Sequence, residues 1–234
     1  MIGRLKVNPI RHGRRLVQCR FFADLYYTPS SCGAASYIAA YRAGILGDKL
    51  KTHQVDLKTH QIKTGPDRGK DFFSVNPKGN VPAIVLDDKT LLNENSVTLQ
   101  WIADQNQPAE LAPPNGTSAR YLLQSKLSYL SSEVHASVAP LFGPGLSSDT
   151  REFLIKQFKS KLQYLSKIEL DDGAKKYLLG DKFTVADAYL YIILTWFHHL
   201  AIDLKQFPVL KKYFENVDKL EFIRKARAAM ATDK

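Results

Sequence analysis

The chain has 234 residues, of which 44% are hydrophobic, 11% aromatic and 24% charged, and its formal net charge is +10. This length and composition suit one large or two small folded domains and exclude wholesale disorder, a collagen and a coiled coil. Two cysteines are too few for a disulfide framework and no apolar run could span a bilayer, so we expect a cytoplasmic protein with no membrane partner.

The positive charge is concentrated at the start of the chain. Residues 1–23 hold six Lys and Arg and no acid, so 27 basic and 23 acidic residues remain over residues 24–234, a net charge of +4. A body with that charge requires no polyanionic partner, and we expect no nucleic-acid binding. The basic segment lacks the apolar stretch of a secretory signal, which leaves a plain N-terminal extension and a mitochondrial presequence as alternatives.

The first elements after this extension form a βαβ unit. Residues 24–27 predict a strand, and a turn leads into a helix that begins at Cys32 and ends at Gly44. Residues 52–57 predict the second strand. The polar residues 58–71 predict an exposed loop, followed by a short helix near Phe72.

A hairpin and a helix complete the first predicted domain, residues 24–108. Strands at 81–87 and 90–93 flank a turn at 88–89, and residues 95–105 have helical spacing. The order βαβ followed by ββα predicts a parallel pair of strands extended by antiparallel ones. A proline-rich linker, residues 109–117, follows.

The rest of the chain, residues 118–231, predicts an all-α domain. Apolar residues step by three and four along a long helix from about Ser118 to Leu141, and another helix covers roughly 149–170. Thr184 and Asp187 form the pattern of a capping box before an apolar, buried helix. Two shorter helices are expected after Pro208 and near Leu220.

Cys32 is the first candidate for chemistry. It follows a strand at the first turn of a helix, where backbone N–H groups and the helix dipole favour an anion, so the pKa of its thiol is expected to fall. The alternative is a small buried apolar residue. Ser30, Ser31 and Tyr27 compete with Cys32 for any role in stabilising a thiolate.

Two further segments can bind a peptide-like ligand. Val81 precedes Pro82 at the start of a strand, where a cis bond would free its backbone N–H and C=O. Glu94 and Asn95 stand where a strand gives way to a helix, so N–H groups can bind a carboxylate while Glu94 accepts from an ammonium. An ordinary helix N-cap is the alternative.

His135 is the remaining candidate. Ser128, Ser131 and Ser132 share its helix face, which is polar and could line a cleft. His198 and His199 are adjacent on a helix and therefore point apart, so no metal site is expected.

These features, in this order, resemble the cytosolic glutathione transferases, and most closely the beta class. The resemblance covers residues 24–231, and its most specific strings are residues 25–32 (LYYTPSSC), 76–83 (NPKGNVPA) and 183–190 (FTVADAYL). It implies a thioredoxin-like N-terminal domain, an all-helical C-terminal domain and a homodimer with glutathione at the domain boundary.

The resemblance also implies roles for single residues. Cys32 would lie opposite the glutathione sulfur, with His135 and Tyr27 in the same catalytic cleft. Val81, before the family's cis-proline Pro82, would pair with the cysteinyl backbone, and Glu94 with the N–H of Asn95 would hold the γ-glutamyl end. His60 matches a lysine of the family near the glycyl end, while Phe142 and Trp196 are expected to line the pocket for a hydrophobic electrophile.

The expected function is therefore conjugation of glutathione to hydrophobic electrophiles, thiol–disulfide exchange through Cys32, or both. Two alternatives remain: a zeta-like glutathione-dependent isomerase, since Ser30-Ser31-Cys32 also resembles the active-site turn of that class, and a non-catalytic binding protein that kept the fold.

Overall fold

The structure is a computed structural model that describes residues 22–200 and 202–232. Nearly all of the basic N-terminal segment lies outside the described residues. The sheet has five strands in the order β3-β2-β1-β4-β5, in which only the β1–β2 pair is parallel. The strands are β1 (Ala23–Tyr27), β2 (Leu50–Asp56), β3 (Gln61–Ile62), β4 (Ala83–Leu86) and β5 (Leu91–Leu92).

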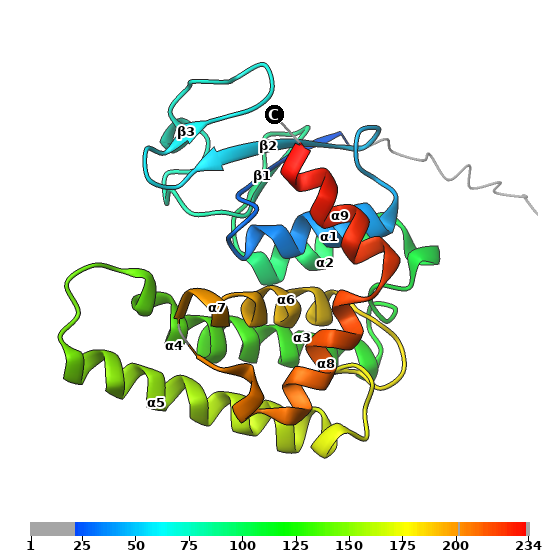
Figure 1. Ribbon diagram of the computed structural model, residues 1–234. Helices are drawn as coiled ribbons and strands as arrows, with labels where there is room; N and C mark the ends of the chain where they lie inside the picture. Colours follow the sequence, from blue (N-terminus) through cyan, green and yellow to red (C-terminus); the bar gives the residue numbers. More distant parts are fainter. Residues whose placement is uncertain (1–21, 201, 233–234) are drawn as a thin grey trace, which may run out of the picture.

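Two helices cover one face of the sheet. Helix α1 (Gly33–Ala43) connects β1 to β2, and α2 (Asn95–Gln105) follows β5 and packs against α1 (Figure 1). Gly44 ends α1 in the left-handed region at φ 65°, and its N–H bonds the carbonyl groups of Ala40 and Tyr41. The predicted βαβ-ββα order is confirmed.

The other face of the sheet carries a smaller core, and here one prediction was wrong. The segment expected as a loop forms strand β3 and places Ile62 in a buried cluster with Tyr26, Val55 and Phe72. A turn of 3₁₀ helix, η1 (Phe72–Ser74), closes this layer. Two apolar side chains in a mainly polar sequence, Ile62 and Phe72, are enough to fold the segment onto the sheet.

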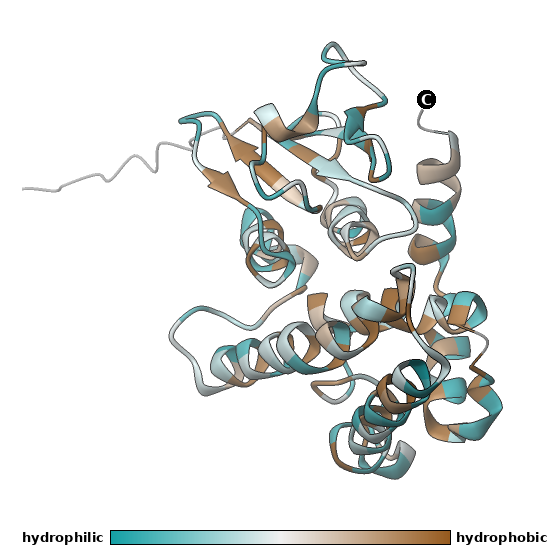
Figure 2. Cartoon of the chain, turned by 90° about the vertical axis from the view of Figure 1, so that its left-hand side faces the viewer, coloured by the Kyte–Doolittle hydropathy of each residue, from teal (hydrophilic) through white to brown (hydrophobic). Residues whose placement is uncertain are grey.

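The second half of the described chain is helical, and its apolar faces point inward (Figure 2). The predicted apolar stripe of the long helix is buried at Leu123, Leu127, Leu130, Val134 and Val138. The helix is not regular, because α3 (Ser118–Tyr129) continues through a π-helical segment, η3 (Leu130–His135). The remaining helices are α4 (Ala136–Val138), α5 (Ser148–Tyr164), α6 (Val185–Thr195), α7 (Phe197–Leu200), α8 (Pro208–Asp218) and α9 (Glu221–Thr232).

The start of α6 is fixed as predicted. The Asp187 carboxylate accepts from Thr184 N and Oγ1, each at 2.8 Å, and the capping box is complete. Asp187 also accepts from the N–H of Leu178 and the hydroxyl of Tyr213, both at 2.8 Å, so a fully buried carboxylate is surrounded by donors.

Contacts between distant segments fix the helical part against the sheet part. The Arg120 guanidinium on α3 donates to both carboxylate oxygens of Asp104 on α2, each at 2.9 Å. Trp196, just after α6, donates to the carbonyl of Ser30 at 3.0 Å. The predicted class, an α/β part followed by an all-helical part, is confirmed, and no helix within the described ranges is long and apolar enough to cross a membrane.

Candidate functional site

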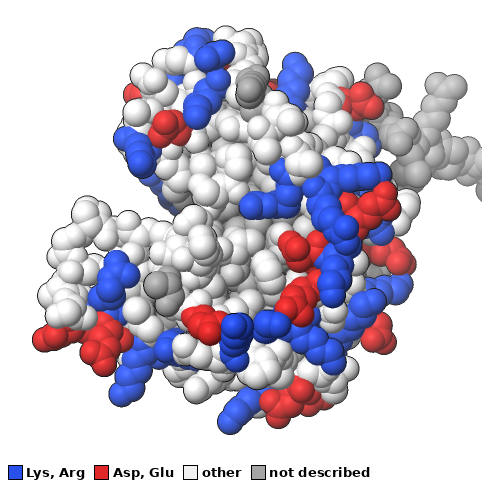
Figure 3. All heavy atoms as spheres, viewed as in Figure 1, with Lys and Arg blue, Asp and Glu red and all other residues white. Residues whose placement is uncertain are grey.

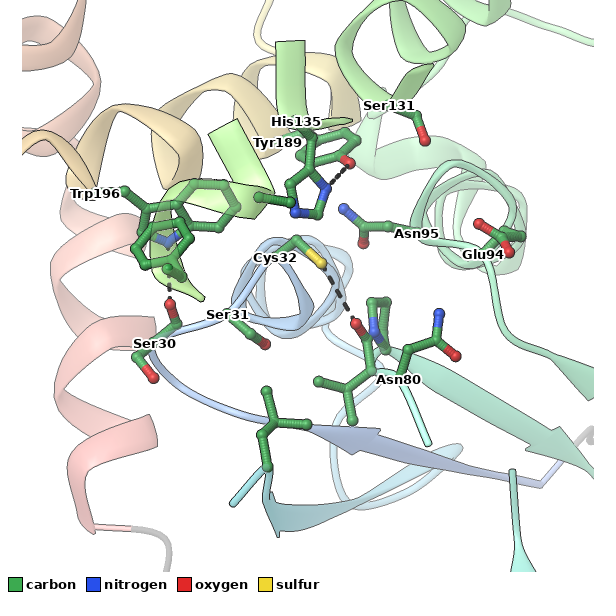
Figure 4. Close-up of a pocket in the computed structure, with 15 residues that line it drawn as sticks. Ser30, Ser31, Cys32, Asn80, Glu94, Asn95, Ser131, His135, Tyr189 and Trp196 are labelled. Atoms are coloured by element: carbon green, nitrogen blue, oxygen red, sulfur yellow. Dashed lines mark hydrogen bonds between the residues drawn. The ribbon is translucent and has the colours of Figure 1, made fainter. Parts of the chain in front are cut away.

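A cavity of about 490 Å³ lies between the sheet part and the helical part, within the ~300–1,000 Å³ typical of small-molecule sites. One wall comes from the β1–α1 turn, residues 80–82 and the start of α2. The other wall comes from η3, the segment 139–142 and the end of α6 (Figure 4). Segments far apart in the sequence therefore meet at one site.

Cys32 lies at the start of α1 with its Sγ donating to the carbonyl oxygen of Val81, at 3.3 Å. The side chain is only 8% exposed, and this burial raises the pKa of the thiol to about 12. The expectation of a lowered thiol pKa is wrong for this structure, because the loss of hydration outweighs the favourable N–H groups of the helix start.

The Val81–Pro82 peptide bond is cis, and strand β4 begins only at Ala83. Val81 thus stands outside the sheet ladder and lines the cavity beside Cys32.

Glu94 and Asn95 form the polar end of the cavity at the beginning of α2. The half-exposed Glu94 carboxylate pairs with Lys78 Nζ at 2.7 Å. Asn95 is only 6% exposed, and its Oδ1 accepts from Ser36 Oγ at 3.1 Å. The first N–H groups of α2 have no partner within the helix, so they are available to an anion.

The helical part contributes His135, Tyr189 and Ser131. His135 Nδ1 lies 2.8 Å from the Tyr189 hydroxyl, and burial lowers the pKa of the imidazole, which favours its neutral form. Ser128 and Ser132 do not line the cavity, and the Ser132 hydroxyl donates to the carbonyl oxygen of Ser128 at 2.9 Å. Tyr189 was missed as a site residue, because Tyr191 and Thr195 on the same helix also carry hydroxyl groups and the sequence alone does not single out Tyr189.

The far end of the cavity is apolar. Phe142 and Trp196 line it, with their rings edge to face at 5.5 Å, and Leu57 and Ala139 lie nearby. The bond from Trp196 Nε1 to the Ser30 carbonyl holds the indole in place. Figure 3 shows that residues other than Lys, Arg, Asp and Glu form most of the lower border of the notch between the two parts.

Two predicted site residues lie away from this cavity. Tyr27 is fully buried, with its ring 4.8 Å from that of Tyr37 and its hydroxyl 3.4 Å from Gln54 Nε2. His60 packs against Phe73, with the two rings tilted and their centroids 4.4 Å apart, in a separate depression formed by residues 59–73. The folding of that segment over the outer face of the sheet carries His60 away from Cys32.

The lining has a simple chemical character. Glu94 is its single residue with a formal charge, so the site suits a ligand with an ammonium group at one end and a neutral or apolar body. Within the described residues, no cluster of three His, Cys, Asp or Glu side chains could hold a metal ion.

Both halves of the chain match models of the same protein family. Residues 50–105 match the family described as "Glutathione S-transferase, N-terminal domain", and residues 138–221 match "Glutathione S-transferase, C-terminal domain". The chain is 31% identical over 205 residues to glutathione S-transferase GstA of Escherichia coli O157:H7, covering 88% of this chain and 97% of that protein.

Solved structures give the same result. A sphingomonad glutathione S-transferase complexed with glutathione has 34% identity and a TM-score of 0.80, over 89% of this chain and 98% of that one. The bacterial beta-class glutathione S-transferase of Sphingomonas chungbukensis has 38% identity and a TM-score of 0.80, over 88% and 98% of the two chains. These similarities confirm the thioredoxin-like and helical fold class and the beta-class resemblance.

Proposed function

The chain belongs to the glutathione S-transferase family, and from this membership we propose that it binds glutathione in the Cys32 cavity and conjugates it to hydrophobic electrophiles. The observation that carries the proposal is the division of this one cavity into a polar end at Glu94 and an apolar end at Phe142 and Trp196. A peptide thiol and an apolar electrophile can therefore be held side by side.

The polar end matches glutathione group by group. The Glu94 carboxylate accepts from the γ-glutamyl ammonium, and the N–H of Asn95 binds the γ-glutamyl carboxylate at the start of α2. The Val81 backbone pairs with the cysteinyl residue; its carbonyl oxygen has a second lone pair beside the one used by Cys32. This orientation brings the glutathione sulfur next to Cys32.

The reaction needs a glutathione thiolate and a nearby electrophile. The thiol proton passes to solvent, the sulfur forms a bond to the electrophilic carbon, and the leaving group departs with its electron pair. Phe142 and Trp196 offer aromatic surfaces to the electrophile. Holding the two reactants together supplies the proximity that such a bimolecular step requires.

A second candidate function is thiol–disulfide exchange through Cys32, which the position of its sulfur in the same cavity favours. The Cys32 thiolate would attack oxidised glutathione, form a mixed disulfide and release one glutathione thiolate. We place this activity second, because a pKa of about 12 leaves little thiolate at neutral pH.

We further propose a homodimer. Helices α2 and α3 pack together and expose Val97, Tyr121 and Leu122, an apolar surface that a second copy could cover. Light scattering should report a dimer that Leu122→Asp converts to a monomer. Ile168→Asp, at another exposed apolar position, should leave the dimer intact.

Turnover and mass measurements test the proposed activity. Wild type and Cys32→Ser are assayed with glutathione and a chromogenic haloaromatic electrophile, and their intact masses are measured after incubation with oxidised glutathione. Conjugation that persists in Cys32→Ser supports the first candidate, and an adduct found only in wild type supports the second. A wild type with neither turnover nor adduct contradicts both.

A further inference from the structure

The turn between β1 and α1 is held at two consecutive residues by side chains from elsewhere in the chain. Trp196 Nε1, just after α6, donates to the carbonyl oxygen of Ser30 at 3.0 Å. Arg227 Nη1, on α9, donates to the carbonyl oxygen of Pro29 at 3.1 Å. Both donors belong to the helical part. The wall of the cavity that carries Cys32 is therefore bound to the helical part at two adjacent points.

The hydrogen bonds within this turn hold its two ends. The N–H and the hydroxyl of Ser31 both donate to the carbonyl oxygen of Thr28, at 3.0 and 2.9 Å, and the Ser31 hydroxyl accepts from the N–H of Gly33 at 3.1 Å. The carbonyl groups of Pro29 and Ser30 lie between these ends, and side chains of the helical part supply their donors. Each backbone carbonyl needs a partner, so the middle of the turn depends on those side chains for its position.

Helix α9 is itself firmly placed, so Arg227 can act as a support. The helix packs against α1 (Figure 1), and its buried residues are Ile223, Ala226 and Met230. The carbonyl oxygen of Met230 accepts from Gln54 Nε2 at 2.9 Å, which joins the end of α9 to β2. Arg227 is half-buried beside these contacts. Its guanidinium is thus carried by a helix that is tied to the sheet part near the turn.

We propose that Arg227 is a positioning residue for the reaction: its bond to the Pro29 carbonyl holds the β1–α1 turn in the place that the glutathione site requires. The inference rests on the proposed function, because it takes glutathione as the ligand. Arg227 is not among the residues that line the cavity, whereas Ser30, Ser31 and Cys32 are. Its effect on the site therefore passes through the turn.

This support should act on the binding of glutathione more than on that of the electrophile. A turn that is already held in place loses little freedom when glutathione binds, whereas a loosened turn must be ordered by the ligand, which weakens binding. Loss of one hydrogen bond from a charged donor at this half-buried position should weaken glutathione binding by about threefold to tenfold. The bond from Trp196 to Ser30 remains, so the apolar end of the cavity should keep its shape.

Amide hydrogen exchange, followed by mass spectrometry, tests the support of the turn in the protein without glutathione. In Arg227→Met the amides of residues 28–33 should exchange about threefold to tenfold faster than in wild type, while those of β4 keep the wild-type rate. Arg227→Lys keeps a charged donor and should restore part of the protection. Arg224→Met is the matched control, because Arg224 on the same helix donates to the carbonyl oxygen of Lys219 at 2.8 Å; it should exchange as wild type does.

Initial-rate kinetics give the second measurement. Arg227→Met should raise the KM for glutathione about threefold to tenfold and leave the KM for the electrophile unchanged, while Arg224→Met should change neither. Unchanged exchange at residues 28–33, an equal increase in β4, or an unchanged KM for glutathione in Arg227→Met overturns the inference. A wild type that does not bind glutathione would instead contradict the proposed function, and the exchange measurement would still decide whether Arg227 holds the turn.

Discussion

The thiol of Cys32 donates a hydrogen bond to the carbonyl oxygen of Val81, 3.3 Å away, across the floor of the cavity. The cysteine at the start of α1 is thus joined to the peptide that precedes the cis-proline. In this structure the sulfur is a buried donor, and the proposed glutathione site does not require a Cys32 thiolate.

The reactivity of Cys32 should reflect this burial. In a Cys19→Ser background Cys32 is the single thiol, and its alkylation by iodoacetamide should be slow at neutral pH. The rate should continue to rise above about pH 10, because burial raises the pKa of the thiol to about 12, well above the ~8.5 of a free cysteine. A rate that reaches its plateau below pH 8 would show that the helix start outweighs burial.

The apolar end of the cavity should govern the electrophile. Phe142→Ser should raise the KM for a hydrophobic electrophile about tenfold, which corresponds to the loss of a contact worth about 1.4 kcal/mol, with the KM for glutathione unchanged. Phe142 is 51% exposed, so the free energy of unfolding should change little. Phe153→Ser, at a position 59% exposed on α5, is the control and should leave both KM values unchanged.

The Asp24–His53 pair should give the fold a dependence on acid. The hydrogen bond from His53, at 2.7 Å, lowers the pKa of the Asp24 carboxyl from its ordinary value of 3.8. Ionised Asp24 therefore stabilises the folded state above that value, and this contribution is lost as the pH falls below it. Urea unfolding should show Asp24→Asn less stable than wild type at neutral pH, with a gap that narrows in acid.

Asp67→Asn provides the comparison for that measurement, since Asp67 pairs with Lys70 at the surface, where such pairs contribute little. Its free energy of unfolding should stay close to that of wild type at both pH values. A gap between Asp24→Asn and wild type that stays constant or widens in acid would contradict the role given to His53.

Alanine substitutions at two glycines in the segment that covers the outer face of the sheet can distinguish the cost of backbone strain from the cost of a steric clash. Gly65 and Gly69 have similar positive φ angles, 80° and 86°, so alanine at either should cost about 1–2 kcal/mol. A Cβ at Gly65 would also lie 2.5 Å from His53 Nδ1, whereas one at Gly69 would meet nothing within 4 Å. Gly65→Ala should therefore unfold about 1–3 kcal/mol more easily than Gly69→Ala; equal values would contradict the packing of this segment.

Regular elements followed from the sequence because their signals are local. The cap at Gly44, the capping box of Thr184 and Asp187 and the helical spacing of residues 95–105 each depend on neighbours within a few positions. Strand β3 was missed because its two residues are stabilised by Val55 and Asp56 across the sheet, a contact no local pattern reveals.

For the candidate site, too, local features could be predicted from the sequence, whereas features that depend on distant segments could not. The positions of Cys32 and Glu94 at helix starts were visible in the sequence, and the structure places both in one cavity. The pKa of the Cys32 thiol depends on burial by distant segments, and so it was predicted in the wrong direction. Tyr27 and His60 were predicted as site residues, but packing places both outside the cavity. Tyr27 on β1 is buried in the core, and His60, next to β3, lies in a separate depression.

Calorimetric titration can show whether glutathione binds at Glu94, with Glu94→Gln and Glu110→Gln as a matched pair of variants. Glu94 lines the cavity, whereas Glu110 pairs with Lys182 at the surface and lies outside it. We expect glutathione to bind wild type and Glu110→Gln with equal affinity, and to bind Glu94→Gln about tenfold more weakly, because the bond to the γ-glutamyl ammonium is lost. Glutathione that binds Glu94→Gln as tightly as wild type, or that does not bind wild type, would contradict this expectation.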